Sequence, residues 1–184
     1  TSPALSLLNS GSATVTACRF SNNSVGALHV HISAPSAGVF VHISDSEFFG
    51  NSIVWHERED YVLPVAGALS VRFSAAAERA TVTVQRCLFD SNRGDRLPPG
   101  LSLQADDWLN HSTFTVVESV FTRNVFDGRL TREDSFDPAG AAAVVLWGGA
   151  HRNQWTIDRC TFDGNEAEFS EHEAVPDASR LPVS

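Results

Sequence analysis

Residues 81–92 read TVTVQRCLFDSN, and residues 154–165 read QWTIDRCTFDGN, the same outline 73 positions later (162 − 89, Phe to Phe). Recurrence of one unit along a chain is the sequence signature of a solenoid. Alignment on Phe-x-x-Asn gives five copies of the unit: Phe20/Asn23, Phe48/Asn51, Phe89/Asn92, Phe121/Asn124 and Phe162/Asn165.

The residues upstream of each Phe repeat as well. The position five residues before it is always Val or Ile, the position seven before it is always apolar, and Thr or His lies between them. This alternation is typical of a strand with one buried face. The spacing of three between Val84 and Cys87 is odd and cannot keep both side chains on one face of a continuous strand, so it predicts a bend near Gln85 and Arg86.

A third apolar segment precedes these two, at 27–30, 68–71, 100–103 and 141–144. Its second residue lies 20 positions before the next Phe in all four cases (48−28, 89−69, 121−101, 162−142). Each unit therefore supplies three short strands separated by bends. The sequence predicts an all-β parallel β-helix of about five rungs, in which like side chains stack about 4.8 Å apart. We expect the Asn residues to form a ladder at a turn that tolerates the left-handed conformation.

The pairing of a Gly-Ala-Leu/Ala segment with Phe-x-x-Asn resembles the repeat of the chlamydial polymorphic membrane proteins and, more widely, right-handed parallel β-helices of the pectin-lyase type. The resemblance covers residues 3–165, with the family's doubled glycine reduced to a single one at four positions. It implies a right-handed solenoid and a surface-exposed, adhesive role. We expect residues 1–165 to form the β-helix, and residues 166–184 to form an acidic tail that caps the last rung or serves as a linker.

Charge and composition exclude two classes of partner. The formal net charge is −9, and all 13 basic residues are arginine with no polybasic cluster, which argues against nucleic acid and anionic membranes as partners. No apolar run of about 20 residues occurs, so we expect no membrane insertion by this segment. The chain opens at Thr1 without a signal peptide, and we expect it to be a processed piece of an extracellular or cell-surface protein.

The three cysteines occupy rungs one, three and five of the alignment. The column two residues before Phe reads Cys18, Ser46, Cys87, Ser119 and Cys160. Neighbouring thiols would be about 10 Å apart, two rung spacings, which is beyond the roughly 7 Å Cα limit for a disulfide. We therefore expect three free thiols that act as small core residues.

Two Asn-x-Ser sequons occur, at Asn22 and at Asn110. Such a sequon is the acceptor for N-glycosylation in secreted proteins. Asn110 falls in a predicted loop and is the better candidate of the two. Glycosylation at either position would support a secretory route.

The residues that most often bind metals do not form a convincing site. His29, His31 and His42 alternate with inward apolar residues and are expected on the outward face. The acidic loop at 106–111 has no second ligand group at a suitable spacing. We expect no metal and no cofactor.

The pectin-degrading β-helices, as the resemblance implies, use either calcium with an Arg or Lys base, or paired Asp residues with a Gly-His-Gly stretch. This chain has no Lys, no Gly-His-Gly and no Asp pair recurring on neighbouring strands. A pair of carboxylates is what glycoside hydrolysis requires. We expect no catalytic residues, and a carbohydrate-active or glycan-binding β-helix is the alternative.

Two long insertions leave the same corner, at 52–66 and 125–139. They mix aromatic residues with charges of both signs, which suits a protein interface, although they could equally cover the side of the helix. The interface candidates are Trp55, His56, Glu57, Arg58, Tyr61, Phe126, Arg129, Arg132 and Phe136. The sequence therefore favours a non-catalytic structural or adhesive module that binds other protein subunits or copies of itself, as in filament assembly, with glycans as possible further partners.

Overall fold

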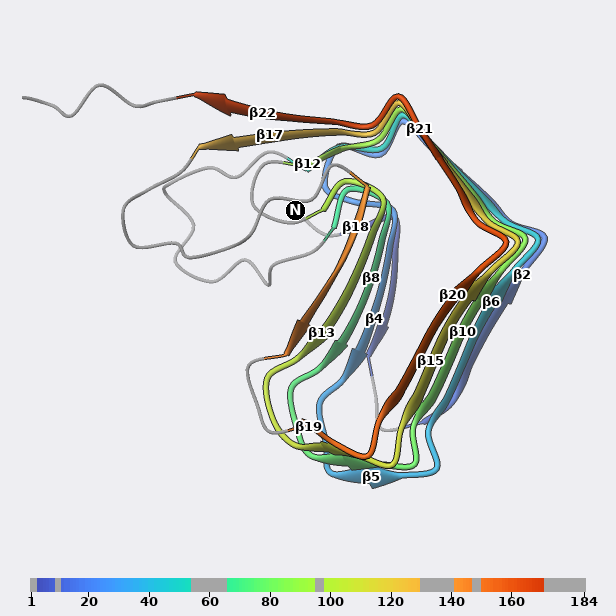
Figure 1. The fold of residues 1–184 in the computed structure, drawn as a ribbon, viewed down its shortest axis with the longest axis vertical. Helices are drawn as coiled ribbons and strands as arrows, with labels where there is room; N and C mark the ends of the chain where they lie inside the picture. The colour runs from blue at the N-terminus through green and yellow to red at the C-terminus, as the bar shows by residue number, and fades with distance from the viewer. Residues whose placement is uncertain are drawn as a thin grey trace, which may run out of the picture.

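The computed structural model describes residues 3–8, 11–53, 66–94, 98–129, 141–146 and 150–170. Three parallel five-stranded sheets wrap around one core, as the sequence predicts, and the chain visits them in turn. Figure 1 looks nearly along the stack, and the chain turns counterclockwise as it advances from its blue start to its red end nearer the viewer, which makes the helix right-handed. The ranges described contain no helix suited to crossing a membrane.

Each of the three main sheets receives one strand from every rung. Sheet 1 contains β1 (Leu5–Leu8), β4 (Leu28–Ile32), β8 (Leu69–Phe73), β13 (Leu101–Ala105) and β18 (Ala142–Leu146). Sheet 2 contains β2 (Ala13–Thr16), β6 (Phe40–Ser44), β10 (Thr81–Gln85), β15 (Thr113–Val117) and β20 (Gln154–Asp158). Sheet 3 contains β3 (Arg19–Ser21), β7 (Glu47–Phe49), β11 (Leu88–Asp90), β16 (Val120–Thr122) and β21 (Thr161–Asp163).

Two smaller parallel sheets lie at the corners, so that most rungs have more than the three strands expected. Sheet 4 contains β5 (Ser36–Ala37), β9 (Ala77–Glu78), β14 (Leu109–Asn110) and β19 (Ala150–His151). Sheet 5 contains β12 (Arg93–Gly94), β17 (Val125–Arg129) and β22 (Glu166–Ser170). Two expectations were wrong here: residues 125–129 form a strand rather than the start of a loop, and parallel pairing continues past residue 165 to Ser170.

The core consists of ladders of identical or similar side chains. Phe89 pairs in register with Phe48 and Phe121, and the ring centroids of successive Phe residues lie 4.6 to 5.2 Å apart with nearly parallel planes. Offset or stacked aromatic pairs at this separation add to the hydrophobic gain of burying the rings. The predicted Phe ladder is therefore confirmed over all five rungs.

The Asn ladder is also confirmed, with one correction to its backbone. From the second rung on, each Asn accepts a bond from the Asn of the preceding rung, as in Asn51 Nδ2 to Asn92 Oδ1 at 3.0 Å, and donates one to a backbone carbonyl. The left-handed residue is not the Asn itself but the residue before it, such as Ser91 with φ 55°. A second left-handed bend falls at Arg86 (φ 50°), where the sequence places the break between two strands.

A close approach of backbones explains the glycine that precedes sheet 1. A Cβ placed on Gly100 would lie 2.5 Å from the carbonyl oxygen of Ala141 in the next rung and 3.1 Å from the Phe121 ring. No side chain fits at such a distance, so residue 100 has to be glycine.

Candidate functional site

The last described rung presents inward-facing apolar side chains that no further rung of the described residues covers. Trp155, Ile157 and Phe162 are 37, 64 and 49% exposed, respectively. Their register partners one rung earlier, Phe114, Val116 and Phe121, are 2, 6 and 0% exposed. We call this surface, made by Trp155, Ile157, Phe162 and the edges of β20 and β21, the open end.

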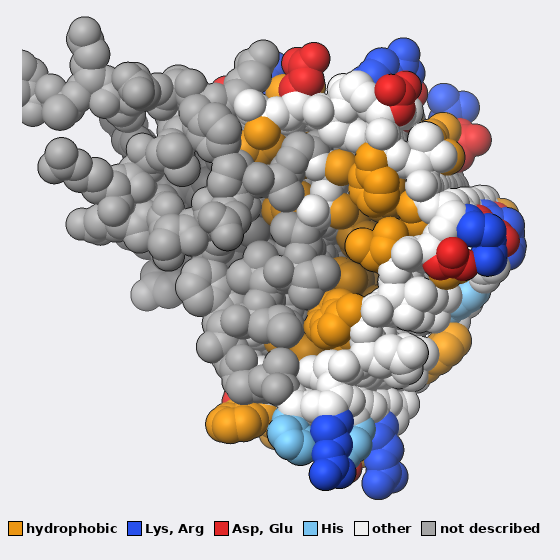
Figure 2. Space-filling model, viewed as in Figure 1, with side chains coloured by type: hydrophobic (Ala, Val, Ile, Leu, Met, Phe, Trp, Pro, Cys, Tyr) orange, Lys and Arg blue, Asp and Glu red, His pale blue; other side chains and the backbone are white. Residues whose placement is uncertain are grey.

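The open end is visible where the solenoid is viewed along its axis. Figure 2, drawn from the direction of Figure 1, shows hydrophobic side chains gathered over the interior of the rung, with charged side chains at the corners. Beside these side chains lie the outer edges of β20 and β21, since each of the two pairs with a single strand of its sheet within the described ranges. Such an edge is a template for another strand, and an apolar surface beside it favours association.

Most of the predicted interface residues cannot be placed. Trp55, His56, Glu57, Arg58, Tyr61, Arg132 and Phe136 lie outside the described residues. Phe126 lies in β17 and is buried, so it is a packing residue rather than an exposed contact. Arg129 ends the same strand, with its backbone paired to Ser170.

The two sequons lie in different environments, and their expected ranking is reversed. Asn110 is half-buried in the short strand β14, not in a loop, and its carbonyl accepts bonds from the Arg79 amide at 2.9 Å and from Ser112 Oγ at 3.1 Å. Asn22 lies exposed in a left-handed bend with φ 55°. Asn22 is therefore the acceptor that a glycosyltransferase could reach more easily.

The three cysteines are free, with Cys87 buried and Cys18 and Cys160 half-buried. Burial raises the pKa of the Cys87 thiol to about 11, so the thiol stays protonated at neutral pH. A protonated, buried thiol is a poor nucleophile. Its sulfur bonds the carbonyls of Gln85 and Ile43, which fits the packing role expected for this column.

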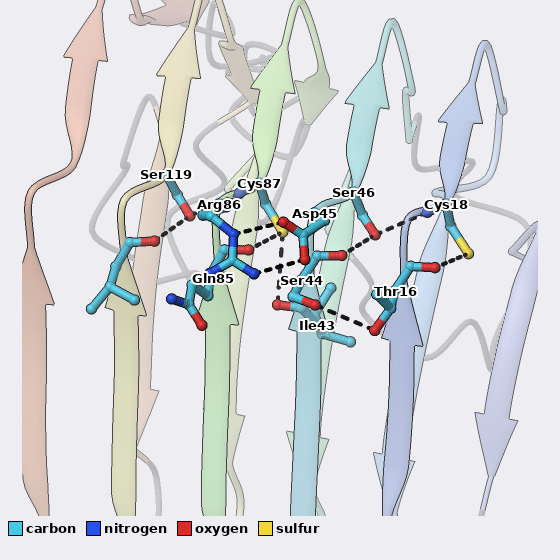
Figure 3. A network of polar contacts seen from close by, with 11 residues as sticks. Thr16, Cys18, Ile43, Ser44, Asp45, Ser46, Gln85, Arg86, Cys87 and Ser119 are labelled. Carbon is cyan, nitrogen blue, oxygen red and sulfur yellow. Dashed lines mark hydrogen bonds and ion pairs between the residues drawn. The ribbon is translucent and has the colours of Figure 1, made fainter.

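The corner between sheets 2 and 3 carries a ladder of alternating charges, and Figure 3 shows one of its pairs, Arg86 with Asp45. Arg86 donates to both carboxylate oxygens of Asp45, at 2.6 and 2.8 Å, and these bonds lower the pKa of Asp45. Arg159 likewise donates to Glu118 and lowers the pKa of that carboxyl. The sequence holds a signal that could have predicted this ladder: the column three residues before Phe reads Ala17, Asp45, Arg86, Glu118 and Arg159.

The outward face of sheet 1, where the sequence places His29, contains a row of buried polar side chains. His29 is only 2% exposed, and neither of its ring nitrogens has a hydrogen-bond partner in the part of the chain that the structure describes. Burial, followed by the charges of His31 and Arg72, lowers the pKa of His29 to about 4. The row continues across the sheet with Ser70, Ser102 and Gln104, all buried.

The carboxylates near this row are engaged by neighbouring groups. Asp106 accepts bonds from Arg72 Nε at 2.8 Å and Nη2 at 2.6 Å, and Asp107 accepts the Trp108 amide at 2.7 Å. Within the described ranges, no group of three or more His, Cys, Asp or Glu side chains could hold a metal ion. The row could therefore donate and accept hydrogen bonds.

Comparison of the chain with family models, with curated proteins and with solved structures finds no match.

Proposed function

We propose that this β-helix is a non-catalytic structural or adhesive module of an extracellular or cell-surface protein, and that it mediates protein–protein assembly. The observation that carries the proposal is the open end, where Ile157 is 64% exposed while the equivalent Val116 is 6% exposed. Burying these side chains would contribute about 25 cal/mol for each Å² removed from water. The ladders beneath them provide a rigid base for such a contact.

A glycan-binding or carbohydrate-active β-helix is the second candidate. The buried polar row on sheet 1 favours it, because His29 and Ser70 have side-chain atoms without a hydrogen-bond partner. Sugar hydroxyls could satisfy such groups if the row became accessible. Catalysis is disfavoured, since Asp106 is paired with Arg72.

A pair of variants tests whether binding occurs at the open end or elsewhere on the surface. Ile157→Glu places a charge on the open end at a position already exposed in the monomer, so the fold should tolerate it. Val120→Glu makes the same change at an exposed apolar position on the side wall of sheet 3. The two proteins and the wild type would be immobilised and offered fluorescent copies of the wild type, fibronectin and collagen.

We expect the wild type and Val120→Glu to capture at least one of these probes, and Ile157→Glu to lose at least tenfold in capture. Equal capture by all three proteins would contradict the proposal. A glycan array and a polygalacturonate cleavage assay test the alternative, because turnover above the blank would replace the structural role with an enzymatic one.

A further inference from the structure

We propose that the partner of the open end is a second copy of this chain, whose first rung stacks on the last rung in a head-to-tail arrangement. The proposal rests on the assembly function above and names its partner. Inside the chain, every rung already packs on the next through parallel pairing and side-chain ladders. A second copy would repeat that interface between molecules.

The two ends have complementary shapes along one side-chain column. The column grows in size along the chain, reading Ala13, Val41, Val82, Phe114 and Trp155. Trp155 stacks on Phe114 with ring centroids 4.0 Å apart and leaves its other face open. The largest member thus stands in the last described rung and the smallest in the first.

A hollow lies beside the smallest member. It has a volume of about 550 Å³ and is lined on its apolar side by Leu7, Ala13, Val30 and Ile32. The first rung is also the shortest: Leu5 lies 15 residues before Phe20, whereas the corresponding spacing in later rungs is 20. The hollow far exceeds the volume of about 30 Å³ that a water occupies. A stacked copy would bring Trp155 onto this column, where the indole could fill the space.

The Asn ladder leaves a donor at one end and an acceptor at the other, as head-to-tail stacking requires. In the first four rungs the backbone N–H of each Asn donates to Oδ1 of the next Asn, at 3.0 to 3.2 Å. The N–H of Asn165 faces the open end, where the described chain offers no further Asn. At the opposite end, Asn23 Oδ1 accepts no such bond from an earlier rung of the described chain. The two groups would meet in a stacked pair.

Charge favours this orientation over a symmetric one. Residues 3–23 contain one charged side chain, Arg19, whereas residues 154–166 contain Asp158, Arg159, Asp163 and Glu166, a net charge of −2. Stacking two open ends would oppose like charges and place Trp155 against its own copy. The head-to-tail contact is heterologous, so it generates a filament rather than a closed dimer.

The cysteine column supplies a specific probe of the junction. Within the chain, a Ser rung separates each pair of thiols, but at the junction Cys160 of one copy and Cys18 of the next fall on adjacent rungs, about 4.8 Å apart. Both are half-buried, and Cys87 is buried. A short bismaleimide should therefore join copies only through Cys160 and Cys18. Serine replaces cysteine without strain, because the same column holds Ser46 and Ser119.

The test uses the full chain at increasing concentration. We expect bismaleimide to convert the wild type into a series of covalent oligomers, Cys18→Ser and Cys160→Ser alone to stay monomeric, and an equimolar mixture of these two variants to stop at the dimer. Ile157→Glu should lower the cross-linked yield at least tenfold, while Val120→Glu leaves it unchanged. Sedimentation velocity without cross-linker should show equal association of the wild type and Val120→Glu, and much weaker association of Ile157→Glu.

Three outcomes would overturn the proposal. Dimers of Cys18→Ser alone would indicate that two open ends meet, and a mixture that fails to form dimers would exclude the junction. Undiminished cross-linking of Ile157→Glu would exclude the open end. If copies fail to associate but Ile157→Glu still loses capture of fibronectin or collagen, the proposed partner is wrong while the assembly function stands. If Ile157→Glu also captures these proteins as well as the wild type does, the proposed partner and the assembly function are both wrong.

Discussion

A buried amide in the Asn ladder is bonded to both neighbouring rungs. Asn92 Oδ1 accepts the backbone N–H and Nδ2 of Asn51, both at 3.0 Å, and its Nδ2 donates to the Phe48 carbonyl at 3.0 Å and to Asn124 Oδ1 at 2.9 Å. Replacing it with alanine leaves several buried polar groups without partners, each costing about 1 to 3 kcal/mol. We expect Asn92→Ala to lower the free energy of unfolding by at least about 3 kcal/mol in urea titrations.

Asn23, at the end of the same ladder, is the matched control. Its side chain donates only to Asn51 Oδ1, at 2.7 Å, and it is partly solvated. Asn23→Ala should cost less than about 1 kcal/mol, because water can replace the lost donor. Equal losses for the two variants would show that the ladder does not stabilise the fold through buried amides.

The protonation of His29 should make the fold sensitive to mild acid. Its pKa is lowered from 6.5 to about 4 in the folded chain, so the unfolded chain binds more protons between these values. Stability is therefore complete above pH 6.5 and falls as the pH drops towards 4. We expect the free energy of unfolding to decrease by about 2 kcal/mol between pH 7 and pH 5 from this residue alone.

Replacement by an apolar residue tests this directly. His29→Leu removes the titration and two buried nitrogens that have no hydrogen-bond partner, so it should flatten the pH dependence and leave stability at pH 7 equal or higher. The exposed His151 is the control, and His151→Gln should keep the wild-type slope. An unchanged slope in His29→Leu would assign the acid sensitivity to other groups.

The sequence predicts single residues well where one column holds one residue type. Phe48 and Asn92 could be placed because Phe and Asn recur at a fixed phase, and stacking like on like follows from the geometry of a rung. The left-handed residue before each Asn was missed, since its column mixes Gly50 with Ser91 and Arg123. The burial of His29 was missed because strand alternation gives the face of a side chain and not what covers that face.

At the scale of elements, the corner ladder of charges links neighbouring rungs. Arg86 pairs with Asp45 on one side, and Glu118 occupies the next rung on the other. Arg86→Glu would place three carboxylates on successive rungs, about 4.8 Å apart. We expect this variant to lower the urea midpoint at low ionic strength, and salt to restore part of the loss by screening.

Arg86→Gln is the control for this change, since it removes the ion pair without adding repulsion. Exposed ion pairs contribute little on their own, so the midpoint should stay close to that of the wild type. A loss as large in Arg86→Gln as in Arg86→Glu would mean that the pair itself, and not like-charge repulsion, decides the stability of this corner.

The strands of the three main sheets could be predicted from their spacing, and those of the corners could not. β10 and β15 alternate Thr with apolar residues, which predicts a strand with one buried face. β17 and β22 lie in segments rich in charge, and their pairing depends on a neighbour in the next rung rather than on a local pattern. The open end follows from the repeat count, whereas the hollow depends on how the shortened first rung packs.

At the scale of the whole molecule, each rung contacts only its neighbours, so stability is set by interfaces between successive rungs. The end rungs have one interface and the central rungs have two. We expect hydrogen exchange to be slowest in β10 and β11 and fastest in β1, β20 and β21, as followed by mass spectrometry of peptide fragments. Uniform protection across these strands would indicate a single cooperative unit.

The alternation of cysteine and serine in the column two residues before Phe makes it possible to detect chains that have folded in the wrong register. A chain that skips one rung while coiling would bring Cys18 beside Cys87, within the range in which a disulfide forms. Oxidant present during refolding would then trap these mistakes as disulfides within one chain, which correctly wound molecules cannot form. The fraction of internally bridged chains after oxidative refolding is thus a direct count of winding errors.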